Sequence, residues 1–286
     1  MPRAPTRLFV EQLTVLDAAR LDAARGLVGE SWIVDVELEG ELDAQSMLVD
    51  FGEVKRRLKR AIDQNGDHSL LVPARAPQLS LHRTRHEIAL RFAAATGAVE
   101  HVSPPQAVTL IDADRVDAAT LARHLQTRLA RELPPNVAAL SIRLRHERIA
   151  GARYHYSHGL KKHTGRCQRI AHGHRSRLEI RIDGRREPQI EAQWAQRWRD
   201  IYLGTREDRV LARNGRWRFE YVSGEGRYAL ELPASRCDLL DADSTVERIA
   251  AHLARRVAAQ RPGAAVEVRA YEGVMKGAVA RAGART

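Results

Sequence analysis

Three histidines and a cysteine in one short segment have the residue types and spacing of a metal site. They are His158, Cys167, His172 and His174. On a β-strand, successive side chains point to opposite faces, so the two imidazoles of His-Gly-His share one face. We expect His158 to fold back across a hairpin as a third ligand. Three imidazoles leave the fourth tetrahedral position of a zinc ion open, as catalysis requires.

Cys167 stands in the predicted connecting loop, five residues before the His-Gly-His. A thiol beside a metal ion or a basic group loses its proton more readily and then serves as a base or nucleophile. The chain has 12 histidines, however, and many of them are expected to be surface groups. The spacing alone therefore leaves two interpretations open, a metal site and a set of surface imidazoles.

The same segment resembles the zinc and cysteine signature of the 6-pyruvoyl-tetrahydropterin synthase family, which includes the 6-carboxytetrahydropterin synthases of the queuosine pathway. The family pattern is aromatic-x-Ala-Ala-His-x-Leu, then Cys, then His-Gly-His. Here residues 154–160 resemble the first part, with Tyr156 and Ser157 in place of the two alanines, and Cys167 and residues 172–174 follow. The resemblance favours the metal site over the surface cluster.

Composition sets broad limits on the protein class. The 286 residues are 44% hydrophobic, which permits one large or two ordinary domains. No apolar run is long enough to cross a bilayer, and the N-terminus lacks the apolar core of a signal peptide. We therefore expect a cytoplasmic protein without a membrane partner. In that compartment Cys167 and Cys237 are not expected to form a disulfide.

The net charge of +11 suits an anionic partner, either nucleic acid or a phosphorylated small molecule. The arginines are scattered along the chain and form no stripe with aromatic platforms, which nucleic-acid binders usually have. We therefore expect a small phosphorylated partner and no nucleic acid. A basic RNA-binding protein with a structural zinc ion is the alternative from another functional class.

Hydrophobic periodicity predicts one order of elements that occurs twice. The first half shows strands at 8–16 and 31–38 around a turn at 25–30, a helix at 52–65, an apolar strand at 107–111, a helix at 117–133 and a strand at 138–144. The second half shows a strand at 176–182, a helix at 189–202, a hairpin at 216–232, a helix at 244–261 and a strand at 266–270. Two units, residues 1–152 and 153–286, follow from this repeat.

Each unit is predicted to be α+β, an antiparallel sheet with helices on one face. This agrees with the tunnelling fold (T-fold) of the resembled family, in which sheets from several subunits join into a barrel. Outer strands must pair with another chain or be blocked. We therefore expect a homo-oligomer.

The family's catalytic segment appears only in the first unit, where Asp67-His68-x-x-Leu resembles Asp-His-x-x-Leu-Asn. In the repeat alignment Asp208-Arg209 takes this place in the second unit, and arginine cannot give up a proton near neutral pH. The first unit in turn lacks the ligands. Ala19, Val28 and Glu30 stand in the alignment where the three histidines are. The resemblance therefore predicts a metal-free unit with the Asp-His pair, a zinc-binding unit with the cysteine, and an active site shared between repeats or subunits.

Three further residues resemble family positions that contact the substrate. Glu272 resembles the glutamate that anchors the pterin ring, and a carboxylate can accept hydrogen bonds from the 2-amino group and ring N3. Glu147 is its expected first-unit counterpart. Thr245 lies in a Ser-Thr-Val-Glu segment that resembles a ligand-touching segment and equally fits a helix capping box.

The resemblance implies a zinc-dependent lyase that breaks a carbon–carbon or carbon–oxygen bond of 7,8-dihydroneopterin triphosphate. The expected product is 6-carboxy-5,6,7,8-tetrahydropterin. Zinc would act as a Lewis acid, while Cys167 and His68, the latter oriented by Asp67, would move protons. Basic side chains would hold the triphosphate. A 6-pyruvoyl-tetrahydropterin synthase or another pterin lyase or aldolase is the alternative within this class.

Overall fold

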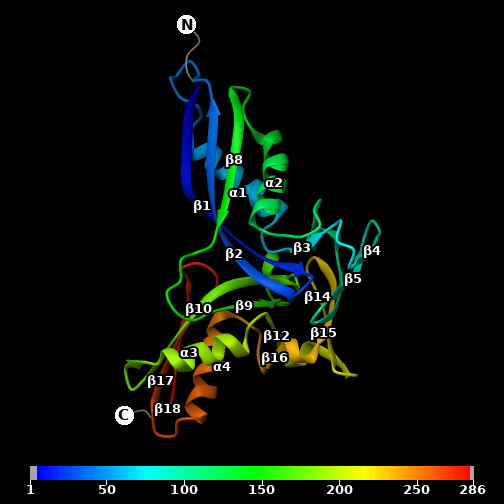
Figure 1. The fold of residues 1–286 in the computed structure, drawn as a ribbon, viewed down its shortest axis with the longest axis vertical. Coiled ribbons are helices and arrows are strands. Elements are labelled where there is room, and N and C mark those ends of the chain that lie inside the picture. The colour runs from blue at the N-terminus through cyan, green and yellow to red at the C-terminus, as the bar shows by residue number, and fades with distance from the viewer. Residues whose placement is uncertain (1–4, 284–286) are drawn as a thin grey trace.

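The computed structural model describes residues 5–283, which form two similar units and one shared sheet (Figure 1). In the first unit the sheet order is β7-β3-β1-β2-β8, and helices α1 and α2 pack on one face. The elements are β1 (Thr6–Asp22), β2 (Gly26–Gly40), α1 (Phe51–Asn65), β3 (Leu70–Pro73), β4 (Leu79–Arg83), β5 (Ile88–Ala94), β6 (Gly97–Ser103), β7 (Val108–Ile111), α2 (Ala118–Leu129) and β8 (Val137–Arg145).

The second unit repeats this plan with the sheet order β16-β12-β9-β10-β17-β18, and β11 pairs with β10. Helices α3 and α4 pack with this sheet around a core of their own. The elements are β9 (Arg153–His158), β10 (His172–Ile182), β11 (Arg185–Arg186), α3 (Pro188–Arg197), β12 (Ile201–Thr205), β13 (Arg209–Arg213), β14 (Arg216–Ser223), β15 (Gly226–Pro233), β16 (Cys237–Leu240), α4 (Val246–Ala259), β17 (Ala265–Tyr271) and β18 (Gly277–Gly283).

The predicted tandem of α+β units is confirmed, with additions that the periodicity did not indicate. The long strands of each unit pair antiparallel, while β3, β7, β12 and β16 join the same sheets through parallel pairs. A third sheet, ordered β13-β14-β15-β6-β5-β4, takes three strands from each unit. Its central pairing of β6 with β15 ties the two halves of the chain together.

Helix α1 illustrates how sequence places the site. The side chain of Asp50 accepts a hydrogen bond from the Glu53 N–H at 2.8 Å and starts the helix. Val54, Leu58 and Ile62 recur at helical spacing and are buried in the first core. Each such side chain stabilises the fold by roughly 1.5–3 kcal/mol. Because α1 is held against the sheet and ends at Asn65, it fixes the position of the Asp67-His68 segment that follows it.

Several boundaries differ from the predicted elements, and two of the differences move residues discussed below. Residues 25–30, expected as a turn, mostly belong to β2, since the turn occupies residues 23–25. The helix expected to run to residue 202 ends at Arg197. Asp200 has a left-handed φ of 57°, which stops the helix, and Tyr202 is then buried in β12.

The two units meet where their hairpins cross. Gly29 of β2 lies directly against Gly173 of β10, and a side chain at either position would collide with the backbone of the other unit. The imidazole of His155 holds the crossing from the side, with its Nδ1 at 2.7 Å from the Gly29 carbonyl oxygen. This close approach brings residues of β1 and β2 to the histidines of β9 and β10. Within residues 5–283, no helix combines the length and apolar character needed to span a bilayer.

Candidate active site

The three predicted metal ligands lie together in the interior of the second unit. His158 and His172 stand directly opposite each other in the antiparallel β9–β10 pair, and His174 follows on the same face of β10. Their potential ligand atoms all lie within 4.8 Å of one another, and each side chain is at most 1% exposed. Strand alternation and hairpin pairing are sufficient to produce this cluster.

Hydrogen bonds fix the orientation of two of the rings. The Nδ1 of His158 lies 2.9 Å from the carbonyl oxygen of Ser244, and the Nδ1 of His172 lies 2.9 Å from that of Arg169. A carbonyl oxygen only accepts, so Nδ1 carries the proton and Nε2 is left for a metal ion. Among the described residues the Nε2 of His158 has no hydrogen-bond partner.

The chemistry of the cluster fits a metal ion. Burial lowers the pKa of His158 and His172 well below the ordinary value, and the neighbouring imidazoles lower it further. Both rings are therefore neutral, the form that binds metal. Buried imidazole nitrogens without partners are costly unless an ion or another group satisfies them. An all-imidazole donor set suits zinc among the common divalent ions.

A carboxylate from the first unit faces the third histidine. Asp17 Oδ1 lies 3.3 Å from Nδ1 of His174, at ion-pair distance but without hydrogen-bond geometry. Burial raises the pKa of Asp17, but His174, Lys276 and a 2.5 Å hydrogen bond from Ser31 outweigh this and lower it to about 2. Asp17 is thus ionised and orients the ligand, as carboxylates beside zinc-binding histidines do.

Asp17, Ser31 and Ser244 were missed by the sequence analysis. Asp17 interrupts the apolar run of β1, and Ser31 stands beside Glu30 in a fully buried stretch of β2. A buried polar residue inside an apolar strand is the signal that could have found them. Ser244 precedes α4, where Thr245 is the N-cap but makes no capping hydrogen bond through its side chain. The capping-box interpretation of Thr245 is therefore wrong.

The Asp-His pair of the first unit reaches this cluster within the same chain. The imidazole of His68 lies 5.1 Å from that of His172 and 6.2 Å from that of His174, between ring centroids. Its Nδ1 is 2.7 Å from Asp67 Oδ2. His68 has a left-handed φ of 50°, and its N–H donates to the Asp17 carbonyl oxygen at 2.6 Å. The backbone therefore holds the ring towards the metal ligands.

Cys167 lies close to His68 and His172, in a short turn at Arg166–Gln168 within the β9–β10 loop. Possible ligand atoms of His68, Cys167 and His172 also lie within 4.8 Å of one another. Burial lowers the pKa of His68, but hydrogen bonds to Asp67 and Cys167 and their charges outweigh it and raise the pKa to about 10. An imidazolium at neutral pH thus lies beside both Cys167 and His172.

A cavity of about 380 Å³ opens onto this acid–base pair. Its walls come from α1, from the segment after α1 and from the β9–β10 loop, and they carry two arginines and two aspartates. The lining residues are Arg60, Asp63, Gln64, Asp67, His68, Arg166 and Cys167. A small charged molecule could enter here and reach both reactive groups.

Of the two candidate pterin anchors, only Glu272 has contacts that lead to the cluster. Lys276 Nζ lies 3.8 Å from Glu272 Oε2 and 3.5 Å from Asp17 Oδ2. The charge of Glu272, after burial, also raises the pKa of Tyr156, which packs against the metal ligands. Glu147 contacts Arg175 through its carbonyl oxygen at 3.0 Å.

Strand register shows which first-unit residues take the positions of the three histidines. Arg20 lies opposite Val28 in the β1–β2 pair, as the first ligand lies opposite the second in β9–β10, and Glu30 takes the third position. The expectation that Ala19 occupies the first position is wrong by one residue, because Ala19 pairs with Gly29. The first unit therefore has one carboxylate and one arginine in place of metal ligands.

The register also changes the expected counterpart of His68. Leu70 pairs with Ala19 of β1, and Tyr202 pairs with Ser157, the equivalent position of β9. Leu70 and Tyr202 are therefore counterparts, and so are the residues two positions before them, His68 and Asp200. Both have a left-handed φ, 50° and 57°. Arg209, expected at this place from the sequence, instead begins β13. The second unit thus has an aspartate where the first has the histidine.

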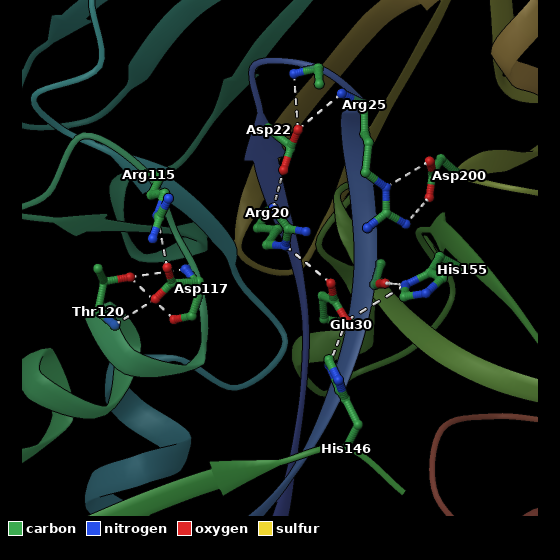
Figure 2. Close-up of polar contacts among 12 residues, drawn as sticks. Arg20, Asp22, Arg25, Glu30, Arg115, Asp117, Thr120, His146, His155 and Asp200 are labelled. Carbon is green, nitrogen blue, oxygen red and sulfur yellow. Dashed lines mark hydrogen bonds and ion pairs between the residues drawn. The ribbon is translucent and has the colours of Figure 1, made fainter. Parts of the chain in front are cut away.

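Ion pairs fill the first-unit position (Figure 2). Arg20 Nε and His146 Nε2 each lie 3.1 Å from a carboxylate oxygen of Glu30, and Arg25 Nε lies 3.0 Å from Asp200 Oδ2. Burial raises the pKa of Glu30, but its bond to His146 and the nearby positive groups lower it to about 2. Within residues 5–283 both groups of potential metal ligands lie at the second-unit site.

Comparison with known proteins identifies the family. The family model described as 6-pyruvoyl tetrahydropterin synthase matches residues 16–155 and, a second time, residues 149–282. The chain belongs to the 6-pyruvoyl tetrahydropterin synthase family. This family comprises lyases that act on pterins, and the present member carries two copies of its domain.

Solved structures similar to the chain include two from Plasmodium. The Plasmodium vivax 6-pyruvoyltetrahydropterin synthase E37A catalytic residue mutant has a TM-score of 0.41 and 17% identity, and the match covers 50% of this chain and 92% of that one. The Plasmodium falciparum 6-pyruvoyl tetrahydropterin synthase has a TM-score of 0.41 and 15% identity, covering 50% and 91%. No curated protein matches the chain.

Proposed function

We propose that this family member is a zinc-dependent lyase that converts 7,8-dihydroneopterin triphosphate into 6-carboxy-5,6,7,8-tetrahydropterin, the reaction that serves queuosine synthesis. One observation carries the proposal. Three buried imidazoles lie beside the Cys167–His68–Asp67 group, which lines a cavity. That arrangement would provide an open metal site and two proton-transfer groups close to one substrate.

His158, His172 and His174 would hold the zinc ion, with Asp17 orienting the third ring. Bound there, zinc would supply Lewis-acid polarisation of the hydroxyl groups of the substrate side chain. The backbone carbonyls that fix the first two rings keep the ligand nitrogens aimed at one point. The surrounding burial excludes water from this point and strengthens its electrostatics.

The proton transfers fall to two groups on one side of the cluster. Cys167, as thiolate, would take a proton from a side-chain carbon of the substrate. The imidazolium of His68 would deliver a proton to the other reacting position, and Asp67 would hold its tautomer and ring orientation. Because His68 comes from the first unit and Cys167 from the second, neither unit alone would complete the reaction.

Substrate binding would use charges around the cavity. Arg60 and Arg166 line it and are suited to bind the triphosphate oxygens. Glu272 would accept hydrogen bonds from the 2-amino group and N3 of the pterin. Thr245 would lie near the substrate, because the carbonyl oxygen of its neighbour Ser244 contacts the imidazole of His158. We assign no substrate contact to Glu147, whose place in the repeat is on the ion-paired first-unit side.

The assembly would be a homo-oligomer. Strands β8 and β18 are the last strands at one edge of each unit's sheet. Exposed strand edges present unpaired backbone groups that pair readily with another chain. Closing the T-fold barrel requires such pairing with further copies.

The test is incubation of the purified protein with 7,8-dihydroneopterin triphosphate, mass analysis of the pterin product and measurement of bound zinc. We expect 6-carboxy-5,6,7,8-tetrahydropterin and zinc at one ion per chain. A 6-pyruvoyl product would keep the family chemistry and overturn the proposed product. Protein that neither binds zinc nor consumes the substrate would overturn the function.

Variants separate the residue roles. His68→Ala and Cys167→Ala should retain zinc and lose turnover by about 100-fold or more. His172→Ala should lose both. The exposed His86, at the turn between β4 and β5, gives a matched control that should change neither. Unchanged turnover in His68→Ala would refute a site shared between the units.

A further inference from the structure

A second cavity, of about 460 Å³, lies at the first-unit ion pairs. Its walls come from the β1–β2 turn, from the start of β9 and from α3 with the segment after it. Three of its lining residues are arginines and none is acidic. The residues are Arg25, Gly151, Ala152, Arg153, Tyr154, His155, Ala192, Ala195, Gln196 and Arg199.

This cavity is the repeat counterpart of the catalytic one. Four residues on its wall, from α3 and the segment after it, stand 132 positions after four residues of the catalytic cavity. The same offset separates Leu70 from its counterpart Tyr202. In order, Ala192, Ala195, Gln196 and Arg199 replace Arg60, Asp63, Gln64 and Asp67. The duplicated chain has therefore kept the hollow on both sides.

The replacements remove the catalytic chemistry and turn a wall of balanced charge into a positive one. Both aspartates of the catalytic wall are gone, one replaced by Ala195 and the other by Arg199. Asp200 stands in place of the catalytic histidine and is held by Arg25 through two contacts of 3.0 and 2.5 Å. An aspartate that is already paired and 2% exposed cannot serve as a free base.

The remaining positive charge is available to a ligand. Arg153 and Arg199 are exposed, and within residues 5–283 neither guanidinium makes an ion pair. Arg25 lines the same cavity, is held by its ion pair with Asp200, and keeps 27% of its side chain exposed. Guanidinium groups bind phosphate oxygens in a planar, two-point geometry, and several on one concave wall give both affinity and orientation.

We propose that this cavity is a metal-free binding site for a phosphate-bearing anion. The ligand contacts are the guanidinium groups of Arg153 and Arg199, with Arg25 at the base. A free polyphosphate and the phosphate tail of a small metabolite share this chemistry. The site does not depend on the reaction assigned to the catalytic cavity, because none of its residues takes part in it.

Isothermal titration calorimetry with inorganic triphosphate tests the proposal on the full, zinc-loaded chain at physiological salt. Because Arg60 and Arg166 also line a cavity, the titration is done in an Arg60→Ala/Arg166→Ala background. We expect saturable one-to-one binding in this background. Adding Arg153→Ala and Arg199→Ala should weaken it by at least about tenfold, the loss of one or more charged phosphate contacts.

The matched control adds Arg185→Ala and Arg261→Ala, which remove the same charge from exposed positions outside the cavity. It should bind as the background protein does. If the Arg153/Arg199 variant and this control bind triphosphate equally, the cavity is not the site and the proposal fails. Repeating the titration with orthophosphate distinguishes a polyphosphate chain from a single phosphate group, and either ligand fits the proposed class.

Discussion

Replacing Gly29 by alanine would place a methyl group where the two units cross. A Cβ at this position would lie 1.9 Å from the carbonyl oxygen of Tyr156 and 2.6 Å from the backbone nitrogen of His174. Both obstacles are backbone atoms of the strands that carry the metal ligands, so no side-chain rotation can relieve the collision. The strands of one unit must move away from those of the other.

The size of the movement follows from the contact distances. Carbon and oxygen atoms approach to about 3.3 Å at closest, so β2 and β9 must separate by about 1.4 Å at this point. Overpacking of this kind costs about 3 kcal/mol or more. Metal coordination tolerates only about 0.2 Å in ligand distances, so the displaced His174 should lose much of its zinc affinity.

Thermal unfolding and competition with a zinc chelator measure the two effects. Gly29→Ala should lower Tm by about 6 °C or more and weaken zinc binding. Gly52→Ala is the matched control, because a Cβ there meets only the flexible side chain of Asp50 at 3.3 Å and lies in a helix. That variant should match or exceed the native Tm. A Gly29→Ala protein with native Tm and native zinc affinity would refute the crossing as the support of the site.

Two further outcomes follow from the buried histidines. Removing zinc with a chelator should lower the free energy of unfolding by about 4 kcal/mol relative to protein in zinc at about 1,000 times its Kd. In a His174→Ala protein, the Tm measured with zinc and the Tm measured with chelator should differ much less. His101 of β6 is buried, and burial lowers its pKa to about 3. The unfolded chain takes up this proton below about pH 6.5 while the folded chain does not, so stability should fall as pH drops through that window, by up to ~1.4 kcal/mol per pH unit. Urea midpoints between pH 6.5 and 4.5 should fall less steeply in His101→Leu, and equal slopes would contradict the assignment.

Local patterns in the sequence were sufficient for the parts that one hairpin or one helix decides. The three predicted metal ligands lie on a single antiparallel pair, so alternation of side chains along β9 and β10 sets their common face. Helix α1 was predicted within a residue of its bounds because Asp50 caps it and its apolar residues recur at helical spacing. The repeated order of elements in turn predicted two units of one fold.

Equivalent positions in the two units were harder to predict, because an alignment of the two repeat sequences does not show which residues pair across neighbouring strands. Ala19 was assigned the place that Arg20 holds, and Arg209 the place that Asp200 holds. Backbone pairing decides these equivalences. A shift of one residue on a strand moves a side chain to the opposite face and changes its chemistry completely.

Only the tertiary structure brought Asp17 to His174 and β6 to β15, and it decided that the approach of His68 to Cys167, which the resemblance implied, occurs within one chain. These contacts join segments about a hundred residues or more apart, and no periodicity in either segment encodes its partner. They arise because the two hairpins cross with their backbones in contact at two glycines, which fixes the position of every side chain around the crossing. The sequence therefore determined which groups could do chemistry, and the packing of one unit against the other decided that these groups lie in one place.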